Sequence, residues 1–303
     1  NADSRAALIG NYHGTSSEYI TVLEGIREEA GDDVRILYSQ GCDLYKDKVE
    51  NLAWDQDRIS EAVITAENSD VVILCVGLDE TLEGEEGDTG NSDASGDKVD
   101  LHLPKVQEEL IEKVTAAGKP TIVVLMAGSA IDLNYAQDNC NGILLAWYPG
   151  ARGGRAVADL LFGKESPSGK LPITFYKDLE GMPEFTDYSM KNRTYRYMEK
   201  EALYPFGYGL TYSDACVTEA EVVGEVSAES DIMLKATVKN NGTVDTDEVV
   251  QVYIKDLDSP LAVRNYSLCG FKRVSLKAGE EKSVEFTISN KAMNIVDEDG
   301  NRY

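Results

Sequence analysis

The sequence contains a cluster of carboxylates whose types and spacing could perform acid–base chemistry. In the stretch LEGEEG, Glu83, Glu85 and Glu86 lie within four positions and glycines flank them. Carboxylates held close together repel one another when ionised, and such repulsion is one way to keep a carboxylic acid protonated for general acid catalysis. The glycines allow the backbone to fold tightly or to approach a ligand. These glutamates are therefore candidates for a general acid.

The wider stretch GLDETLEGEEGDTGNSDASGDKVDLHLP, with nine acidic residues, allows two other interpretations. As a calcium loop, DTGNSDASGD fails the EF-hand order, because the glycine of the sharp turn and the closing glutamate are misplaced. The sequence has only two histidines, His13 and His102, and no CxxC pair, so it predicts no metal site. A solvated surface loop fits most of these carboxylates, and from the residues alone it is favoured over catalysis.

Other catalytic and binding motifs are absent or weak. GxSxG and GxxxxGK[ST] do not occur, and IGNYHG near the start lacks the GxGxxG spacing of a dinucleotide-binding turn. YPGARGG, residues 148–154, precedes a helix-like segment and could bind an anion through backbone N–H groups. A tight turn with close packing is the better interpretation of so short a glycine pattern.

The composition of the chain limits the partners and the cellular compartment that can be expected for it. The chain has 303 residues, which suggests two domains, and a formal charge of −25 from 54 acidic and 29 basic residues. Such a surface repels phosphate backbones and anionic lipid, so we expect no nucleic acid and no membrane partner, while neutral sugars fit. No apolar run approaches the roughly 18 to 20 residues of a membrane span. Five scattered cysteines favour reduced thiols, and with them a cytoplasmic over a secreted location.

The first part of the chain alternates strand-like and helix-like segments. DVRILYS (residues 33–39), DVVILCVG, TIVVLMAG and GILLAWYPG read as strands, the middle two as strands buried on both faces. EYITVLEGIREEAG, DRISEAVITAENS, LPKVQEELIEKVTAAG and GGRAVADLLFG have helical spacing, and SAIDLNYAQDNC reads as a short helix with Ser129 as its cap. This order predicts a mainly parallel sheet with helices on both faces, and the acidic stretch leaves from the end of one of its strands.

From about Thr211 the pattern changes to period-two alternation, as in Val284, Phe286 and Ile288, with turn signals between segments. This predicts an all-β sandwich of the immunoglobulin or fibronectin type III kind. We expect an α/β domain over 1–176, a connector packed on both domains over 177–212, and the β-sandwich over 213–303, incomplete at its C-terminus. The first residue, Asn1, suggests a fragment or a processed product.

Several stretches together resemble glycoside hydrolase family 3, a group of β-glucosidases and β-xylosidases. They are LIGNYHGTSSEYITVLEGI, GLDETLEGEEGD, AWYPGARGGRAVADLLFGKESPSGKLPITF, RTYRYMEKEALYPFGYGLTYS and LCGFKRVSLKAGEEKSVEFTIS, in the order of the family. The resemblance implies an α/β sandwich domain and a fibronectin type III-like domain. It also implies a (β/α)8-type barrel, for which the sequence has no matching segment.

The resemblance implies retaining hydrolysis of terminal β-glucosides or β-xylosides by two carboxylates and no cofactor. The nucleophile is an Asp on the barrel, which would be on the same or another polypeptide, and the acid/base is a Glu on the sandwich-domain loop. Without a barrel, this chain is expected to be inactive, or to serve as a non-catalytic carbohydrate-binding or scaffold fragment. The sugar and the oligomeric state, including a homo-oligomer, stay open.

The family pattern places the acid/base at Glu85 when counted from Gly77, and at Glu86 when counted back from GDK; we favour Glu85. Glu83 is expected to shape the loop or to contact sugar. The arginine that usually follows the family's Asp is absent at Thr89, and Lys98 is the candidate replacement. The tyrosines of RTYRYMEKEALYPFGYGLTY are expected to anchor the connector rather than to stack on sugar.

Overall fold

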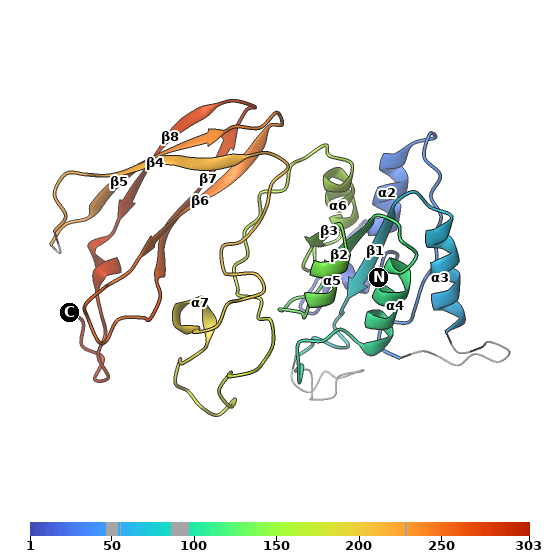
Figure 1. The fold of residues 1–303 in the computed structure, drawn as a ribbon, viewed down its shortest axis with the longest axis horizontal. Coiled ribbons are helices and arrows are strands. Elements are labelled where there is room, and N and C mark those ends of the chain that lie inside the picture. Colours follow the sequence, from blue (N-terminus) through green and yellow to red (C-terminus); the bar gives the residue numbers. More distant parts are fainter. Residues whose placement is uncertain (47–53, 55, 86–96, 228) are drawn as a thin grey trace. The chain divides into compact units, whose positions relative to one another are not determined.

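A computed structural model describes residues 1–46, 54, 56–85, 97–227 and 229–303. The chain divides into two compact units, one of residues 1–162 with 176–179 and the other of residues 163–175 with 180–303 (Figure 1). The domain limits predicted at 176 and 212 stay a prediction, as does the packing of the connector on the first domain. None of the helices in the described parts of the chain is long and apolar enough to cross a bilayer.

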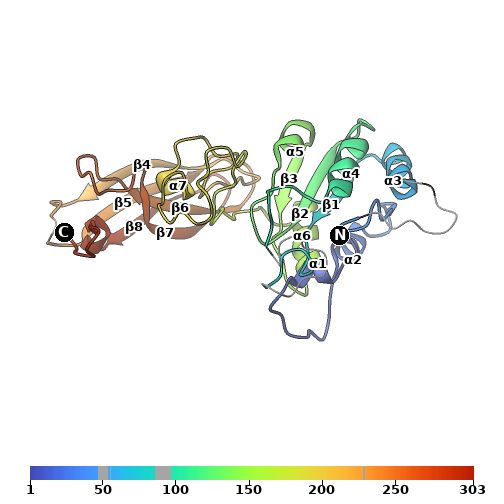
Figure 2. The same ribbon diagram turned by 90° about the horizontal axis from the view of Figure 1, so that it is seen from below.

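The first unit is built around a three-stranded parallel sheet in the order β1-β2-β3, with Val72 opposite Thr121 and Ile122 opposite Gly142. Helices cover both faces of this sheet, with α1, α2 and α6 on one side and α4 and α5 on the other (Figure 2). The fold class predicted from the alternating pattern is therefore confirmed. In chain order the elements are α1 (Ala6–Ile9), α2 (Val22–Ala30), α3 (Asp57–Glu67), β1 (Val72–Gly77), α4 (Lys105–Thr115), β2 (Thr121–Met126), α5 (Asn134–Asn139), β3 (Gly142–Leu145) and α6 (Gly153–Leu161).

Strands β1 and β2 are largely buried because their side chains enter a core on each face of the sheet. One core cluster joins α1, α2 and α6 to the strands through Ala7, Val22, Cys75, Val124, Met126 and Val157. On α4, the buried residues Leu110, Ile111 and Val114 recur at helical spacing, and this helix packs against β1. Burial raises the pKa of the Cys75 thiol to about 11, so this cysteine is protonated and unreactive near neutral pH.

Helices α2 and α6 approach so closely that glycine is required at their contact. A Cβ added to Gly25 would lie 2.2 Å from the carbonyl oxygen of Gly154, and one added to Gly154 would lie 1.9 Å from that of Thr21. Thr21 also begins α2 with a capping box, in which its side chain accepts from the N–H of Glu24 and the Glu24 carboxylate accepts from the N–H of Thr21.

Two local predictions for this unit are wrong. Residues 34–39 form no strand, because no backbone hydrogen bond pairs them with β1 in the described structure; instead they line a cavity of about 950 Å³ together with α3 and β1. The helix expected after Ser129 begins only at Asn134, where the side chain of Asp132 accepts from the Asn134 N–H. Ser129 is therefore not its cap.

The second unit contains antiparallel sheets of the order β4-β5-β8 and β6-β7. Their inner faces share a core of Val238, Val250, Leu276, Val284, Phe286 and Ile288, as the period-two pattern predicts for a β-sandwich. This confirms the predicted fibronectin type III-like fold class. Its elements are α7 (Thr194–Tyr197), β4 (Ala215–Val223), β5 (Ile232–Asn240), β6 (Thr246–Ile254), β7 (Ser267–Leu276), β8 (Glu281–Ile288) and the 3₁₀ helix η1 (Asn290–Met293).

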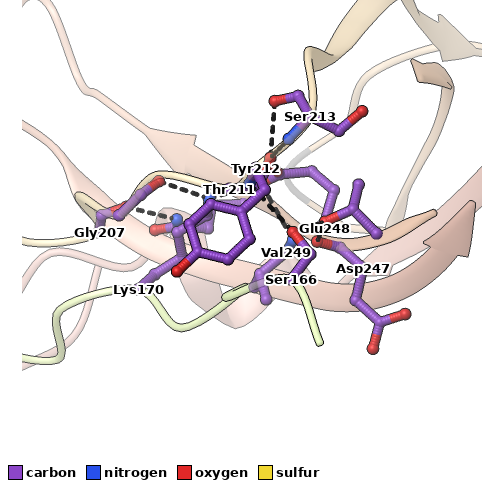
Figure 3. Close-up of polar contacts among 12 residues, drawn as sticks. Ser166, Lys170, Gly207, Thr211, Tyr212, Ser213, Asp247, Glu248 and Val249 are labelled. Carbon is purple, nitrogen blue, oxygen red and sulfur yellow. Dashed lines mark hydrogen bonds and ion pairs between the residues drawn. The ribbon is translucent and has the colours of Figure 1, made fainter. Parts of the chain in front are cut away.

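A largely buried ion pair holds residues 163–175 within this second unit. Lys170 Nζ lies 2.9 Å from a Glu248 carboxylate oxygen of β6, and both side chains are 13% exposed. The same ammonium donates to the carbonyl of Gly209 at 2.8 Å. Ser166 Oγ accepts from the N–H of Tyr212 at 3.0 Å, so polar contacts join this segment to both β6 and the connector (Figure 3).

Aromatic side chains also anchor the connector to the β-sandwich. The rings of Tyr195 and Phe206 stack with centroids 4.2 Å apart, and Tyr253 of β6 and Tyr266 pack against Tyr195. Tyr208 stacks on Tyr204 in the same way. Ring-on-ring packing of this kind supports the anchoring role expected for the connector tyrosines.

The contact between α2 and α6 gives a test of the fold. Gly154→Ala should lower the free energy of unfolding by about 1–3 kcal/mol or more, because the added methyl group meets backbone atoms that cannot move aside cheaply. Gly14→Ala is the control, since a Cβ there meets nothing within 4 Å. Urea unfolding of both variants measures the difference, and equal stabilities would contradict the close helix contact.

Candidate active site

The acidic loop begins at Gly77, the last residue of β1, where side chain and backbone interactions fix its direction. Gly77 has a φ of +140°, and a Cβ there would lie 1.8 Å from the carbonyl oxygen of Met126. Gln107 of α4 is buried, and its side-chain amide accepts from the N–H of Gly77 and donates to the carbonyls of Gly77 and Leu44, at 2.7–2.8 Å. The loop therefore leaves the sheet from one defined backbone position.

A tight turn follows directly. The Asp79 carboxylate accepts from both the N–H and the hydroxyl of Thr81, at 2.9 and 2.7 Å. The Asp79 carbonyl accepts from the N–H groups of Leu82 and Glu83 at 3.0 and 2.9 Å. Leu82 is buried, so the turn is fixed by an apolar contact as well as by hydrogen bonds. This turn brings the Glu83 side chain back toward the sheet.

Three protein donors from the ends of the neighbouring strands bind the carboxylate of Glu83. Its Oε2 accepts from the N–H of Gly128 and from the hydroxyl of Tyr148, both at 2.6 Å, and its Oε1 accepts from the hydroxyl of Ser129. Gly128 and Ser129 follow β2, and Tyr148 follows β3. The carboxyl ends of all three parallel strands thus meet at this one side chain, at the edge of the sheet where ligands usually bind.

The ring of Tyr148 fits between two glycines. A Cβ at Gly10 would lie 2.6 Å from the ring, and one at Gly128 would lie 2.9 Å from it, so larger residues would displace it. The preceding residue, Trp147, has a φ of +54°, an unusual conformation for a bulky side chain. Burial first, and then the hydrogen bond to Glu83, raise the pKa of Tyr148 well above its ordinary value. Its hydroxyl therefore stays protonated and remains a donor.

A lysine lies on the returning part of the loop. Lys98 Nζ donates to the carbonyl of Ala130 at 2.7 Å, next to the two donors that follow β2. Burial lowers the pKa of Lys98, while the charges of Glu83 and Asp100 act in the opposite direction. The positive charge thus belongs to the same cluster as Glu83, where it offsets a negative charge at the sheet edge.

His102 ties the end of the loop to α4. Its Nδ1 donates to Glu108 at 2.9 Å, and Asp132 lies 3.8 Å away. The hydrogen bond to Glu108 is the main cause that raises the pKa of His102, and the charges of Glu108, Asp100 and Asp132 add to it. The loop is therefore fixed where it leaves β1 and where it enters α4.

Of the site residues predicted from the sequence, the structure describes Glu83 and Glu85, and the two differ in their contacts. Glu85 follows Glu83 by two residues and is exposed. Glu86 and Thr89 lie outside the described residues. Glu83 binds three protein groups, which favours the loop-shaping role among the two expected for it.

Sequence reasoning missed the donors Gly128, Ser129 and Tyr148. Each of them lies at or directly after the carboxyl end of a predicted strand segment, and that shared position was the signal that could have found them.

The glycine N–H groups of the turn before α6 are already hydrogen-bonded within the protein. The N–H groups of Gly150, Gly153 and Gly154 donate to the carbonyls of Leu8, Gly150 and Ile20. The turn is therefore a packing feature, as the preferred interpretation of YPGARGG expects. Among the described residues, no group of three or more His, Cys, Asp or Glu side chains is arranged to hold a metal ion.

A parallel α/β domain with an anchored carboxylate loop, followed by a fibronectin type III-like sandwich, defines a class of two-domain proteins. This chain belongs to glycosyl hydrolase family 3, because the family's C-terminal domain profile matches residues 1–212. A fibronectin type III-like domain profile matches residues 248–303.

Proteins similar to this chain carry glycosidase names. A beta-xylosidase of Formosa agariphila is 36% identical over 96% of this chain, and a periplasmic beta-glucosidase of Salmonella typhimurium is 31% identical over 96%. The solved structure of a β-glucosidase from Erythrobacter marinus superposes with a TM-score of 0.80 at 30% identity over 98% of this chain. The chain spans only 39%, 41% and 42% of the three proteins, respectively.

The hydroxyl of Tyr148 gives the first test of this site. Tyr148→Phe should lower the free energy of unfolding by about 1–3 kcal/mol, because it removes a donor from a partly buried carboxylate. Tyr135→Phe is a matched control, since that hydroxyl makes only an exposed contact with Thr115, and we expect an effect within about 0.5 kcal/mol. Urea unfolding compares the two, and a Tyr148 effect no larger than the Tyr135 effect would contradict the anchoring role.

His102 gives a test by pH. Because its pKa is raised in the folded state, its contribution to stability is complete below the ordinary histidine pKa and is lost as pH rises through the raised pKa. His102→Gln should therefore lower the free energy of unfolding at acidic pH by about 0.2–1 kcal/mol, a small value because the side chain is exposed, and by less at alkaline pH. In a Glu108→Gln background most of this pH dependence should disappear; its persistence would assign the effect to other groups.

Proposed function

We propose that this chain supplies the general acid/base of a retaining β-glycosidase that acts on terminal β-glucosides or β-xylosides. The observation that carries this proposal is the binding of Glu83 by Gly128, Ser129 and Tyr148. This contact holds the start of the acidic loop at the carboxyl edge of the parallel sheet, where Glu85 is exposed two residues further on. A carboxylate so placed can reach a substrate bound outside the sheet.

Glu85 is the residue we propose for acid/base catalysis. It donates a proton to the glycosidic oxygen as the leaving group departs, and it then deprotonates the water that releases the sugar. Glu86 is the alternative, on the sequence pattern alone. Glu83 is a positioning residue in this proposal, because its carboxylate oxygens already accept hydrogen bonds from the protein and would have to give them up to bind sugar.

The second carboxylate lies outside this chain in the proposed mechanism. A retaining enzyme needs a nucleophilic carboxylate about 5–5.5 Å from the acid/base, and the family resemblance places that Asp on a barrel. The lengths of the relatives support this, since this chain corresponds to about two fifths of each. The names beta-xylosidase and beta-glucosidase support glycosides as the substrate class. We expect this chain to be inactive without the barrel.

Kinetics of the barrel-containing enzyme test the assignment of the acid/base. Glu85→Ala should lower kcat/KM by about 10²–10⁴-fold on glycosides with poor leaving groups, since these need proton donation. The loss should be much smaller on activated aryl glycosides, which need little proton donation. Azide should partly restore turnover, because this anion can attack without the base that water requires. Aryl β-xyloside and aryl β-glucoside, compared in the same assay, identify the sugar.

Glu86→Ala is the matched control for this experiment. If it shows the leaving-group dependence and azide rescue while Glu85→Ala does not, the acid/base is Glu86. If neither variant shows them, the chain has no acid/base role, and a non-catalytic carbohydrate-binding or scaffold function would replace this proposal.

A further inference from the structure

Two aromatic side chains of the connector point into solvent. Phe185 is 88% exposed and Tyr188 is 90% exposed, the highest values among the large hydrophobic side chains of the described residues. Met190, two residues further on, is 44% exposed. Single exposed apolar residues are common on proteins, but two large rings and a methionine within six positions form a patch of the kind used for contacts with other proteins.

The backbone beneath this aromatic patch (Phe185, Tyr188 and Met190) is held by one arginine. Arg193 Nη2 donates to the carbonyls of Glu184 and Asp187 at 2.9 and 3.0 Å. Asp187 in turn accepts from the N–H of Ser189 at 2.8 Å, and its own N–H donates to Glu184. Arg193 thus fixes one carbonyl directly before Phe185 and another directly before Tyr188, so the two rings project from a hydrogen-bonded loop.

The backbone at the base of this loop is strained. Asn192 and Thr194 have φ values of +59° and +55°, and for a β-branched residue such as Thr194 this conformation is strained. Asn192 Nδ2 donates to the carbonyl of Gly181 at 3.0 Å, which closes the loop across eleven positions. Backbone strain of this kind clusters at functional sites, and no described residue of the chain covers the two rings.

The observations favour one occupant for the aromatic patch. A second copy of this chain is disfavoured, because each copy has a formal charge of −25 and the patch itself is flanked by Glu184 and Asp187. The relatives, however, contain more than half of their length outside the region that this chain matches. A domain of that size needs a contact surface on this chain if the two are to stay together.

We propose that the aromatic patch is a docking surface for the catalytic barrel, which would bear an apolar pocket rimmed by neutral or basic groups. Phe185 and Tyr188 insert into that pocket, and Arg193 acts as the positioning residue that holds the loop. The inference rests on the proposed function only in requiring that a barrel accompanies this chain. It does not depend on which glutamate is the acid/base.

Hydroxyl-radical labelling followed by mass spectrometry tests this contact without measuring turnover. The rates at Phe185 and Tyr188 are compared between this chain alone and the barrel-containing enzyme, with Phe271 of β7, 67% exposed, as the reference. We expect the rates at Phe185 and Tyr188 to fall at least fivefold more than the rate at Phe271. An equal fall at all three positions, or no fall, would overturn the proposal. Protection that appears in this chain alone as its concentration rises would also overturn it, in favour of self-association.

A variant pair provides a second measurement. The double variant Phe185→Ser with Tyr188→Ser should lower the thermal unfolding midpoint of the barrel-containing enzyme by several degrees and leave that of this chain alone unchanged. Phe271→Ser is the matched control.

A loss of acid/base activity in Glu85→Ala enzyme with full protection of Phe185 would support the docking surface. Protection without any acid/base effect of Glu85 or Glu86 would remove the proposed catalytic role and leave the docking surface standing.

Discussion

The contact between one carboxylate and three donors organises the carboxyl edge of the parallel sheet. Glu83 is the point where the loops after β1, β2 and β3 meet, because its oxygens bind Gly128, Ser129 and Tyr148 together. A carboxylate gains from binding three protein donors in place of water only if those donors are already held in position. The glycines around Tyr148, the amide clamp of Gln107 on Gly77 and the turn at Asp79 supply that preorganisation.

This arrangement separates two tasks among neighbouring glutamates. The chain uses one carboxylate to fix the backbone and leaves the next one, Glu85, exposed to solvent. A group that is to transfer protons must be accessible to substrate, and its position must nevertheless be defined to within a fraction of an ångström. Under the proposed function, the anchor two residues earlier serves both requirements, because it fixes the start of the loop and leaves the Glu85 side chain exposed.

Local patterns in the sequence predicted most of the fold and only part of the site. The apolar runs of β1 and β2 and the helical spacing of α4 are properties of short segments, so they could be recognised directly. Residues 34–39 have the composition of a strand, but a strand also needs a hydrogen-bonding partner, which no local pattern reveals. The same holds for Glu83, whose donors are 45, 46 and 65 positions away in the sequence. The family pattern identified the loop and gave Glu83 a role in shaping it or contacting sugar, but it could not show which groups bind the Glu83 carboxylate.

The buried pair of Lys170 and Glu248 has a consequence for how such proteins can recombine during evolution. Lys170 lies before the predicted end of the α/β domain at residue 176, yet its charge is neutralised by a carboxylate of β6. A gene fusion that joined two family members at residue 176 would bring together a lysine and a glutamate that had not evolved as partners. Any mismatch would leave a largely buried charge without its counterion, which is strongly destabilising. Exchange of these domains between relatives is therefore expected to succeed when the junction lies before residue 163, so that the segment and its sandwich are inherited together.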